Sequence, residues 1–212
     1  KKDFNIYVAD SFMNSSVRVF ERLKVILNDS GKHYRNKINV FEGDIRDKKF
    51  LKNIFLQASQ KNEEIDCVIH LAGLKSVRES VVNPLLYWDV NVNGSLNLFK
   101  VMEESNCKTL LFSSSATVYG NSGEIPFKES NSLEPINPYG QTKATIEKIL
   151  RNIFDADSHS WRILNLRYFN PIGAHPSGLI GENPAVCSEN IFPAILQVAS
   201  GIREKLLIFG ND

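Results

Sequence analysis

Residues 66–72 read Asp-Cys-Val-Ile-His-Leu-Ala, a continuous apolar run without alternation of apolar and polar positions. A strand of this kind is buried on both faces, which is typical of a parallel sheet covered by helices on either side. Further apolar runs stand at residues 109–113 and 162–168, with amphipathic stretches between them. Strands and helices that alternate at this spacing predict βαβ units, so we expect an α/β fold with a doubly wound parallel sheet.

The rest of the chain extends the same alternation. Apolar runs predict further strands at residues 5–10, 38–41 and 206–209. Helices are expected at about residues 15–28, from Asp47 as the N-cap, from Pro84, from Pro138 and over about residues 191–200. Because Cys67 stands inside an apolar strand, we expect it to be a buried, reduced thiol.

Composition and charge exclude several classes of protein. The 212 residues are 42% hydrophobic and 23% charged, and the formal net charge of +1 provides no bulk positive field for nucleic acid or an anionic membrane. No apolar run approaches the roughly 20 residues that a membrane-spanning helix needs. The histidines and cysteines lack the spacing of metal ligands. We therefore expect a cytoplasmic protein with no metal site that binds neither nucleic acid nor membrane.

Asp10 is the first candidate for a binding role, because ligands of an open α/β sheet bind outside the carboxyl ends of its strands. An acid that closes such a strand accepts hydrogen bonds from the ribose hydroxyls of a dinucleotide. The glycine-rich phosphate turn of that fold stands about 20 residues upstream of the acid, whereas only nine residues precede Asp10. Either Asp10 is an ordinary strand-end residue, or the first strand and the glycine turn precede this chain.

Tyr139 and Lys143 stand four residues apart in the helix expected from Pro138, which places them on one face, one turn apart. A tyrosine hydroxyl with an ordinary pKa of about 10 is a poor base at neutral pH. A neighbouring lysine cation favours the phenolate, so we expect Lys143 to lower the pKa of Tyr139 and make it a general acid/base. The alternative is an exposed tyrosine and lysine on a helix surface, because this spacing also arises by chance.

A serine-rich turn supplies a third candidate. Residues 113–120 read Ser-Ser-Ser-Ala-Thr-Val-Tyr-Gly and follow the buried strand at residues 109–113, so they project at the carboxyl edge of the sheet. Ser115 is expected to hydrogen-bond both the reacting oxygen and the phenol of Tyr139. A serine turn followed about 25 residues later by Tyr-x-x-x-Lys is more specific than either motif alone.

Together these motifs resemble those of the extended short-chain dehydrogenase/reductase family, and within it the UDP-glucose 4-epimerase branch. The likeness runs over nearly all 212 residues. The Tyr-x-x-x-Lys motif is generic to the superfamily, whereas residues 169–178 and the Ala-Gly-Leu-Lys loop at residues 72–75 point to the epimerase branch more narrowly. The resemblance implies a Rossmann-like, doubly wound fold that is incomplete at both ends, tightly held NAD and a UDP-sugar substrate.

The resemblance also implies roles for individual residues in interconverting UDP-glucose and UDP-galactose through a transient 4-keto sugar. Tyr139 is the acid/base at the sugar 4-hydroxyl, Ser115 bonds the 4-oxygen, and Lys143 holds the nicotinamide ribose. The other implied cofactor contacts are Asp10, Ser11, Asn14 and Ser15 at the adenosine end, Asp44 and Ile45 beside the adenine, Leu71, Ala72, Gly73 and Lys75 along the dinucleotide, and Phe169 by the nicotinamide. Substrate contacts are implied for Lys75, Ser115, Tyr139, Asn170, Asn190 and Phe209.

By the same resemblance, residues 1–170 form the NAD-binding domain and residues 171–212 begin the substrate-binding region. The glycine-rich turn and a C-terminal arginine for the substrate phosphates have no counterpart in the chain, and Val90 stands where an asparagine is expected at the cofactor. We interpret the chain as an internal fragment of a longer enzyme that is a homodimer. We expect these 212 residues alone to bind NAD poorly.

Other functions stay open on the sequence alone. A 4,6-dehydratase needs an additional acid/base pair, and the family places an acidic residue directly after the serine turn, where this chain has Ala116 and Thr117. Another NAD-dependent sugar-nucleotide epimerase, acting on an N-acetylhexosamine or a pentose, fits the same motifs. A non-catalytic nucleotide-binding protein on the same fold is disfavoured by the intact Ser115, Tyr139 and Lys143.

Overall fold

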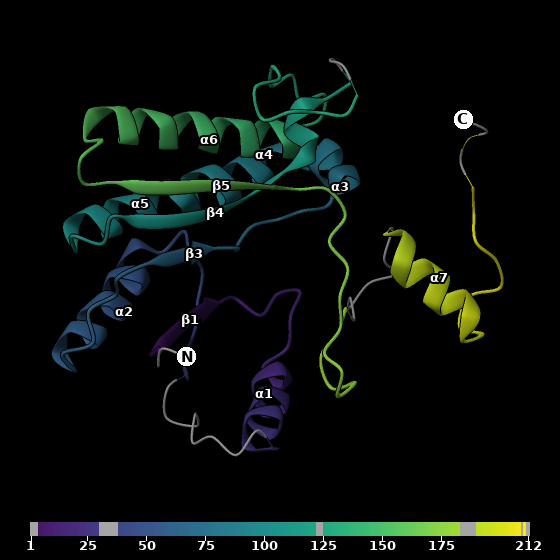
Figure 1. Ribbon diagram of the computed structural model, residues 1–212, viewed down its shortest axis with the longest axis horizontal. Helices are drawn as coiled ribbons and strands as arrows, with labels where there is room; N and C mark the ends of the chain where they lie inside the picture. The colour runs from purple at the N-terminus through teal and green to yellow at the C-terminus, as the bar shows by residue number, and fades with distance from the viewer. Residues whose placement is uncertain (1–3, 30–37, 122–124, 183–189, 209, 211–212) are drawn as a thin grey trace. The chain divides into compact units, whose positions relative to one another are not determined.

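The computed structural model of the protein describes residues 4–29, 38–121, 125–182, 190–208 and 210 (Figure 1). The chain divides into two compact units. The first comprises Lys1–Asp10 with Asn39–Asn170, and the second comprises Ser11–Ile38 with Pro171–Asp212. The assignment of residues 1–170 and 171–212 to two functional domains stays a prediction.

The first unit contains a three-stranded parallel sheet in the order β3-β4-β5. Its register places Ser114 beside Arg167 and Ser115 beside Tyr168, so the serine turn leaves the sheet at the carboxyl end of two neighbouring strands. Parallel strands connected through helices confirm the predicted α/β class. The strands are β3 (Val68–His70), β4 (Thr109–Ser115) and β5 (Arg162–Tyr168), while β1 (Ile6–Asp10) and β2 (Ile38–Glu42) form a separate two-stranded sheet.

Two helices begin where the sequence predicts. Asp47 caps α2 (Lys48–Gln60), because its carboxylate accepts hydrogen bonds from the amides of Lys49 and Phe50 at 2.9 and 3.1 Å. Pro138 opens α6 (Pro138–Ala156), and the Asn137 side chain accepts a hydrogen bond from the Gly140 amide at 2.8 Å. Figure 1 shows α6 running along β4 and β5.

The helix expected from Pro84 is interrupted. The structure has α4 (Pro84–Tyr87), a π-helical segment η1 (Trp88–Asn93) and then α5 (Gly94–Glu104), preceded by α3 (Val77–Val82). Within η1 the Asn91 side chain is buried and hydrogen-bonds outside the helix, and the hydroxyl of Ser95 donates to the Asn91 carbonyl. Such π segments occur frequently at functional sites.

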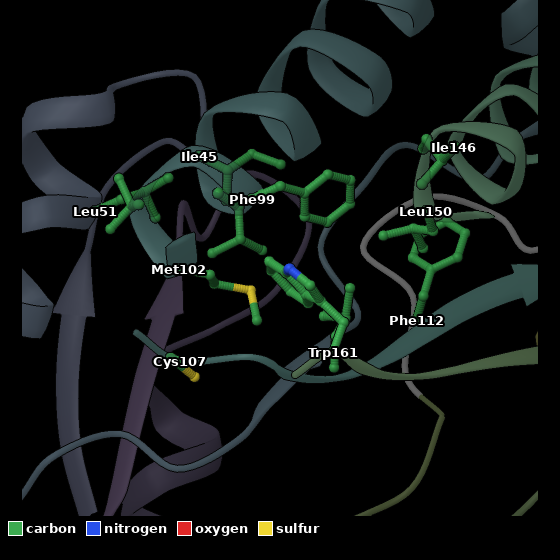
Figure 2. Packing of buried hydrophobic residues seen from close by; sticks show 12 residues of the cluster. Ile45, Leu51, Phe99, Met102, Cys107, Phe112, Ile146, Leu150 and Trp161 are labelled. Carbon is green, nitrogen blue, oxygen red and sulfur yellow. The ribbon is translucent and has the colours of Figure 1, made fainter. Parts of the chain in front are cut away.

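The core of the first unit joins α2, α5, β4 and α6 (Figure 2). Phe99 and Met102 of α5 pack with Phe112 of β4, and Ile146 and Leu150 of α6 complete the cluster. Truncating a buried side chain of this size costs about 2–5 kcal/mol of stability. The other members are Ile45, Leu51, Leu98, Val101, Cys107, Leu110 and Trp161. This packing fixes α6 against β4, the two elements that carry Tyr139 and Ser115.

Two further expectations from the sequence, a buried Cys67 and a strand at residues 206–209, need correction. Cys67 is exposed, because β3 begins only at Val68 and leaves the thiol before the strand. Residues 206–208 form no strand, and residue 209 lies outside the described residues. His70, the last residue of β3, is buried, and its Nε2 lies 2.8 Å from the Ser95 hydroxyl.

The second unit contains α1 (Arg18–Asp29) and α7 (Ile191–Ala199). A turn near residues 174–181 is closed by an antiparallel bridge between Ala174 and Gly181 and by the His175 amide, which donates to the Ile180 carbonyl at 2.7 Å. Among the described residues, no helix has the combined length and apolar character that crossing a membrane requires.

Candidate active site

The first turns of α6 bring Tyr139 and Lys143 to one side of the helix. Both side chains are buried, with 9% and 5% of their surface exposed. The Lys143 Nζ lies 5.9 Å from the centre of the Tyr139 ring. The predicted pairing on one face is therefore present, and the alternative of two exposed surface residues is wrong.

Lys143 is held against the end of β4. Its Nζ donates a hydrogen bond to the Ser113 carbonyl at 2.8 Å and lies 4.8 Å from the centre of the Phe112 ring. Burial disfavours the charged form and lowers the pKa of Lys143 to about 8. The same ammonium contributes to lowering the pKa of the buried His70, whose main cause is desolvation.

Tyr139 differs from the expectation that its lysine neighbour makes it acidic. Desolvation raises the pKa of Tyr139, and the hydrogen bond from Ser115 lowers it only in part. The Tyr87 ring packs edge-on against Tyr139 with the ring centres 6.5 Å apart, which contributes to the dry surroundings. Burial thus outweighs the hydrogen bond from Ser115, and the phenol keeps its proton at neutral pH.

Ser115 is the last residue of β4 and the N-cap of the short 3₁₀ helix η2 (Ala116–Tyr119). Its Oγ accepts hydrogen bonds from the Thr117 amide at 3.3 Å and from the Thr117 hydroxyl at 3.0 Å. Because a hydroxyl has one hydrogen and two lone pairs, these two donors leave the hydrogen of Ser115 free to point at Tyr139. The role of Thr117 in orienting Ser115 was missed by the sequence analysis.

Asn91 connects the loop after β3 to the start of α6. Its side chain, 1% exposed, accepts a hydrogen bond from the Leu74 amide at 2.8 Å and donates to the Leu74 carbonyl and the Thr142 hydroxyl, both at 3.1 Å. The Thr142 hydroxyl in turn donates to the Tyr139 carbonyl at 2.7 Å. The sequence singled out residues 91–94 only as a matching segment, since no local pattern shows that this asparagine points inward.

Gly73 lies beside this network. Its φ of +151° is a conformation that side chains rarely adopt. A Cβ on it would stand 3.0 Å from the Asn91 Oδ1 and 3.8 Å from the Lys143 Nζ. The absence of a side chain at this position therefore leaves space next to the ammonium.

Asp10 and Asp44 lie at the carboxyl ends of β1 and β2. The Asp10 carbonyl accepts a hydrogen bond from the Gly43 amide at 3.0 Å. The Asp44 carboxylate accepts a hydrogen bond from the guanidinium of Arg46 at 2.6 Å, and this hydrogen bond lowers the pKa of Asp44. Ile45 is buried, and a Cβ on Gly94 would stand 2.7 Å from its side chain.

The remaining residues implied in binding are divided between the two units. Leu71, Ala72, Lys75, Phe169 and Asn170 belong to the first unit and are exposed. The second unit holds four more exposed candidates, Ser11, Asn14, Ser15 and Asn190, of which Asn190 donates to the Glu182 carboxylate at 3.0 Å. Phe209 lies outside the described residues.

Curated relatives of this chain include UDP-glucose 4-epimerases. UDP-glucose 4-epimerase 2 of Arabidopsis thaliana is 44% identical over 209 residues, which are 99% of this chain and 57% of that protein. The UDP-glucose 4-epimerase of Neisseria meningitidis serogroup A is 44% identical over 213 residues, covering 100% of this chain and 59% of that protein. The chain thus spans somewhat more than half the length of these relatives, and the predicted resemblance to UDP-glucose 4-epimerases is confirmed.

Solved structures show the same fold. The UDP-glucose 4-epimerase of Stenotrophomonas maltophila, with bound NAD and formylated UDP-arabinopyranose, matches 97% of this chain and 57% of its own with a TM-score of 0.87 and 38% identity. The enzyme of Bifidobacterium longum, in complex with NAD+ and UDP, gives a TM-score of 0.82 at 40% identity over 95% of this chain and 56% of its own. The Rossmann-like architecture is confirmed by these matches. Because residues 2–212 match the family model described as GDP-mannose 4,6 dehydratase, the chain belongs to that family.

Proposed function

We propose that the chain is part of an NAD-dependent UDP-glucose 4-epimerase, which interconverts UDP-glucose and UDP-galactose through a 4-keto sugar. The observation that carries this proposal is the cluster of Ser115, Tyr139 and Lys143, which places a hydroxyl donor, a phenol and a buried ammonium at the carboxyl end of β4. The relatives support it, because they are UDP-glucose 4-epimerases and two of the solved structures hold NAD together with a UDP-sugar or UDP.

The space beside Lys143 fits the nicotinamide end of NAD. A Cβ at Gly73 would fill that space, so the glycine permits close approach of a ligand to the ammonium. Lys143 would hold the nicotinamide ribose, with Phe169 by the nicotinamide. The adenosine end would be held by Asp10, Ser11, Asn14, Ser15, Asp44 and Ile45, and the intervening part by Leu71, Ala72, Gly73 and Lys75.

The reaction needs a group that takes a proton from the sugar 4-hydroxyl and returns it. Bound NAD supplies the hydride acceptor and a positive charge that favours the phenolate of Tyr139. Tyr139 moves the proton, and Ser115 directs its one hydrogen to the phenol or to the 4-oxygen of the sugar. The Ser113 carbonyl keeps the Lys143 ammonium in place. Asn170, Asn190, Lys75 and Phe209 are the further substrate contacts that we propose.

A 4,6-dehydratase is the second candidate, because the description of the matching family favours it. Elimination of water needs a further acid/base pair. The residues after Ser115 are Ala116, which has no polar side chain, and Thr117, whose hydroxyl donates to Ser115. Incubation of the complete protein with UDP-glucose distinguishes the candidates: the epimerase forms UDP-galactose, and the dehydratase forms a 4-keto-6-deoxy sugar nucleotide.

The decisive variant is Tyr139→Phe in the full-length protein. We expect turnover to fall by orders of magnitude while NAD stays bound, because only the hydroxyl that moves the proton is lost. Formation of UDP-galactose and the NAD content of the purified protein are the two measurements. Tyr7→Phe, which removes from β1 a hydroxyl that donates to Glu63, is the matched control. Unchanged turnover in Tyr139→Phe would remove Tyr139 from the mechanism.

We also propose that the complete enzyme is a cytoplasmic homodimer that pairs through the helices beginning at Pro84 and Pro138. The exposed apolar side chains of Leu85 and Leu86 on α4, the helix that begins at Pro84, support the dimer. Free cysteines at positions 67 and 107 support a reducing compartment. Within that enzyme, residues 1–170 would bind NAD and residues 171–212 would begin the substrate-binding region.

A further inference from the structure

A carboxylate that the proposed reaction does not use is buried beside the candidate active site. Glu147 follows Lys143 by one turn of α6 and is 5% exposed. Its Oε1 accepts a hydrogen bond from the Ser114 hydroxyl at 2.5 Å and another from the Arg167 Nε at 3.0 Å. Its Oε2 accepts from the second arm of the same guanidinium at 2.7 Å. A buried charge of this kind is retained only when it is fully paired, and here the pairing is complete.

Arg167 extends the network to the serine turn. Its Nη1 donates to the Tyr119 hydroxyl at 2.9 Å and to the Glu129 carbonyl at 3.2 Å, and its guanidinium lies 5.0 Å from the centre of the Tyr119 ring. The Tyr119 ring also stacks on Phe127, with the ring centres 4.9 Å apart. One guanidinium therefore connects β5, where it originates, to the end of η2 and to α6.

The point at which this network meets β4 is Ser114. Its neighbour Ser113 accepts the hydrogen bond of Lys143, and its other neighbour Ser115 donates to Tyr139. Ser114 is also the register partner of Arg167 in the parallel sheet. The Glu147 carboxylate of α6 thus binds Ser114. This residue of β4 lies between the residue that contacts Lys143 and the residue that contacts Tyr139. A shift at Ser114 displaces Ser113 and Ser115 together.

We propose that Glu147 and Arg167 are positioning residues, which act through Ser114 to hold Ser115 and the Ser113 carbonyl at the correct distances from Tyr139 and Lys143. This inference rests on the proposed epimerase function. It adds to that function the ion pair between the Arg167 guanidinium and the Glu147 carboxylate, whose closest atoms are 2.7 Å apart. Misplacement of a catalytic group by about 1 Å costs roughly 100-fold in rate, so loosening of this contact is expected to lower kcat.

Ser114→Ala in the full-length enzyme is the most direct test, because it removes the connection to β4 and keeps the ion pair. We expect kcat to fall about 10- to 100-fold with KM within about threefold of the parent value. Glu147→Gln, which removes the charge, is expected to act in the same direction. Asp155→Asn is the matched control, because Asp155 stands on the same helix in an exposed ion pair with Arg151 at 3.9 Å.

A second readout does not require turnover. The hydrogen bond from Ser115 lowers the pKa of Tyr139, so displacement of Ser115 raises it. The pH dependence of the Tyr139 ¹³Cζ chemical shift is expected to move to higher pH in Ser114→Ala and to stay unchanged in Asp155→Asn. This measurement distinguishes failure of the proposal from failure of the epimerase assignment, because it holds for a protein with any substrate.

A merely structural role predicts a different result. The variants would then unfold at lower temperature, while kcat below the transition and the titration of Tyr139 would match the parent protein. That result in Ser114→Ala overturns the proposal. If Glu147→Gln fails to fold, Ser114→Ala alone decides, because it leaves no buried charge without a partner.

Discussion

Lys143 is expected to reduce the stability of the protein at neutral pH, and Lys143→Met tests this. Its pKa is lowered from 10.5 to about 8 in the folded chain. The unfolded chain therefore holds the proton more tightly between these values, and stability rises with pH across that interval. The difference of about 2.5 pKa units corresponds to a destabilisation of about 3 kcal/mol at pH 7. Met keeps the apolar stem without the charge.

The magnitude is best measured as a difference between two pH values. Integrating the same linkage, the cost of Lys143 falls from about 3 kcal/mol at pH 7 to about 1 kcal/mol at pH 9.5. Removing Lys143 also leaves the Ser113 carbonyl without its donor, at a cost of about 1–3 kcal/mol that is the same at both pH values. The stability of Lys143→Met relative to the parent should therefore decrease by about 2 kcal/mol between pH 7 and pH 9.5.

Urea denaturation of both proteins at the two pH values supplies the assay. Ionisable groups distant from Lys143 contribute equally to both proteins and cancel in the comparison. Comparable unfolding slopes in urea would show that both proteins unfold in the same manner. A relative stability that does not change between pH 7 and pH 9.5 would refute the argument that burial governs the charge of Lys143.

Two further predictions concern the surroundings of the same cluster. Gly73→Ala should lose about 1–3 kcal/mol of stability, because φ is +151° and the new Cβ would approach the Asn91 Oδ1 to 3.0 Å. Thermal unfolding measures the loss. Gly201→Ala is the control that separates backbone strain from crowding, because Gly201 has a φ of +74° and a Cβ there would meet no atom within 4 Å. Thr117→Val removes a hydroxyl that donates to Ser115 and should lower kcat about tenfold with little change in KM. Equal kcat values in the variant and the parent protein would show that Thr117 does not orient Ser115.

Local sequence patterns predicted the elements that carry the site. Pro138 in the first turn and the apolar spacing after it placed Tyr139 and Lys143 one turn apart on a helix, and the structure has that helix. Asp47 was recognised as an N-cap for the same reason, since capping depends on residues within a turn of one another. The run at residues 109–113 predicted the buried strand that ends at Ser115.

The interruption of the helix after Pro84 could not be predicted in this way. Its apolar spacing favours one continuous helix, but Asn91 bonds to Leu74, 17 residues away in sequence, and to Thr142, 51 residues away. Hydrogen bonds over such separations exist only after the elements have packed. The prediction that Cys67 is buried was wrong for a related reason, because an apolar run does not show where pairing with the neighbouring strand begins.

The sequence by itself determined the alternation of strands and helices, the spacing of Tyr139 and Lys143, and the resemblance to UDP-glucose 4-epimerases, because each of these depends on residues close together in the chain. Only the tertiary structure decided that the pKa of Tyr139 is raised and that Glu147 pairs with Arg167 and Ser114. The physical reason is that the energy of a charge depends on the water, dipoles and ions around it, and folding supplies these from distant segments.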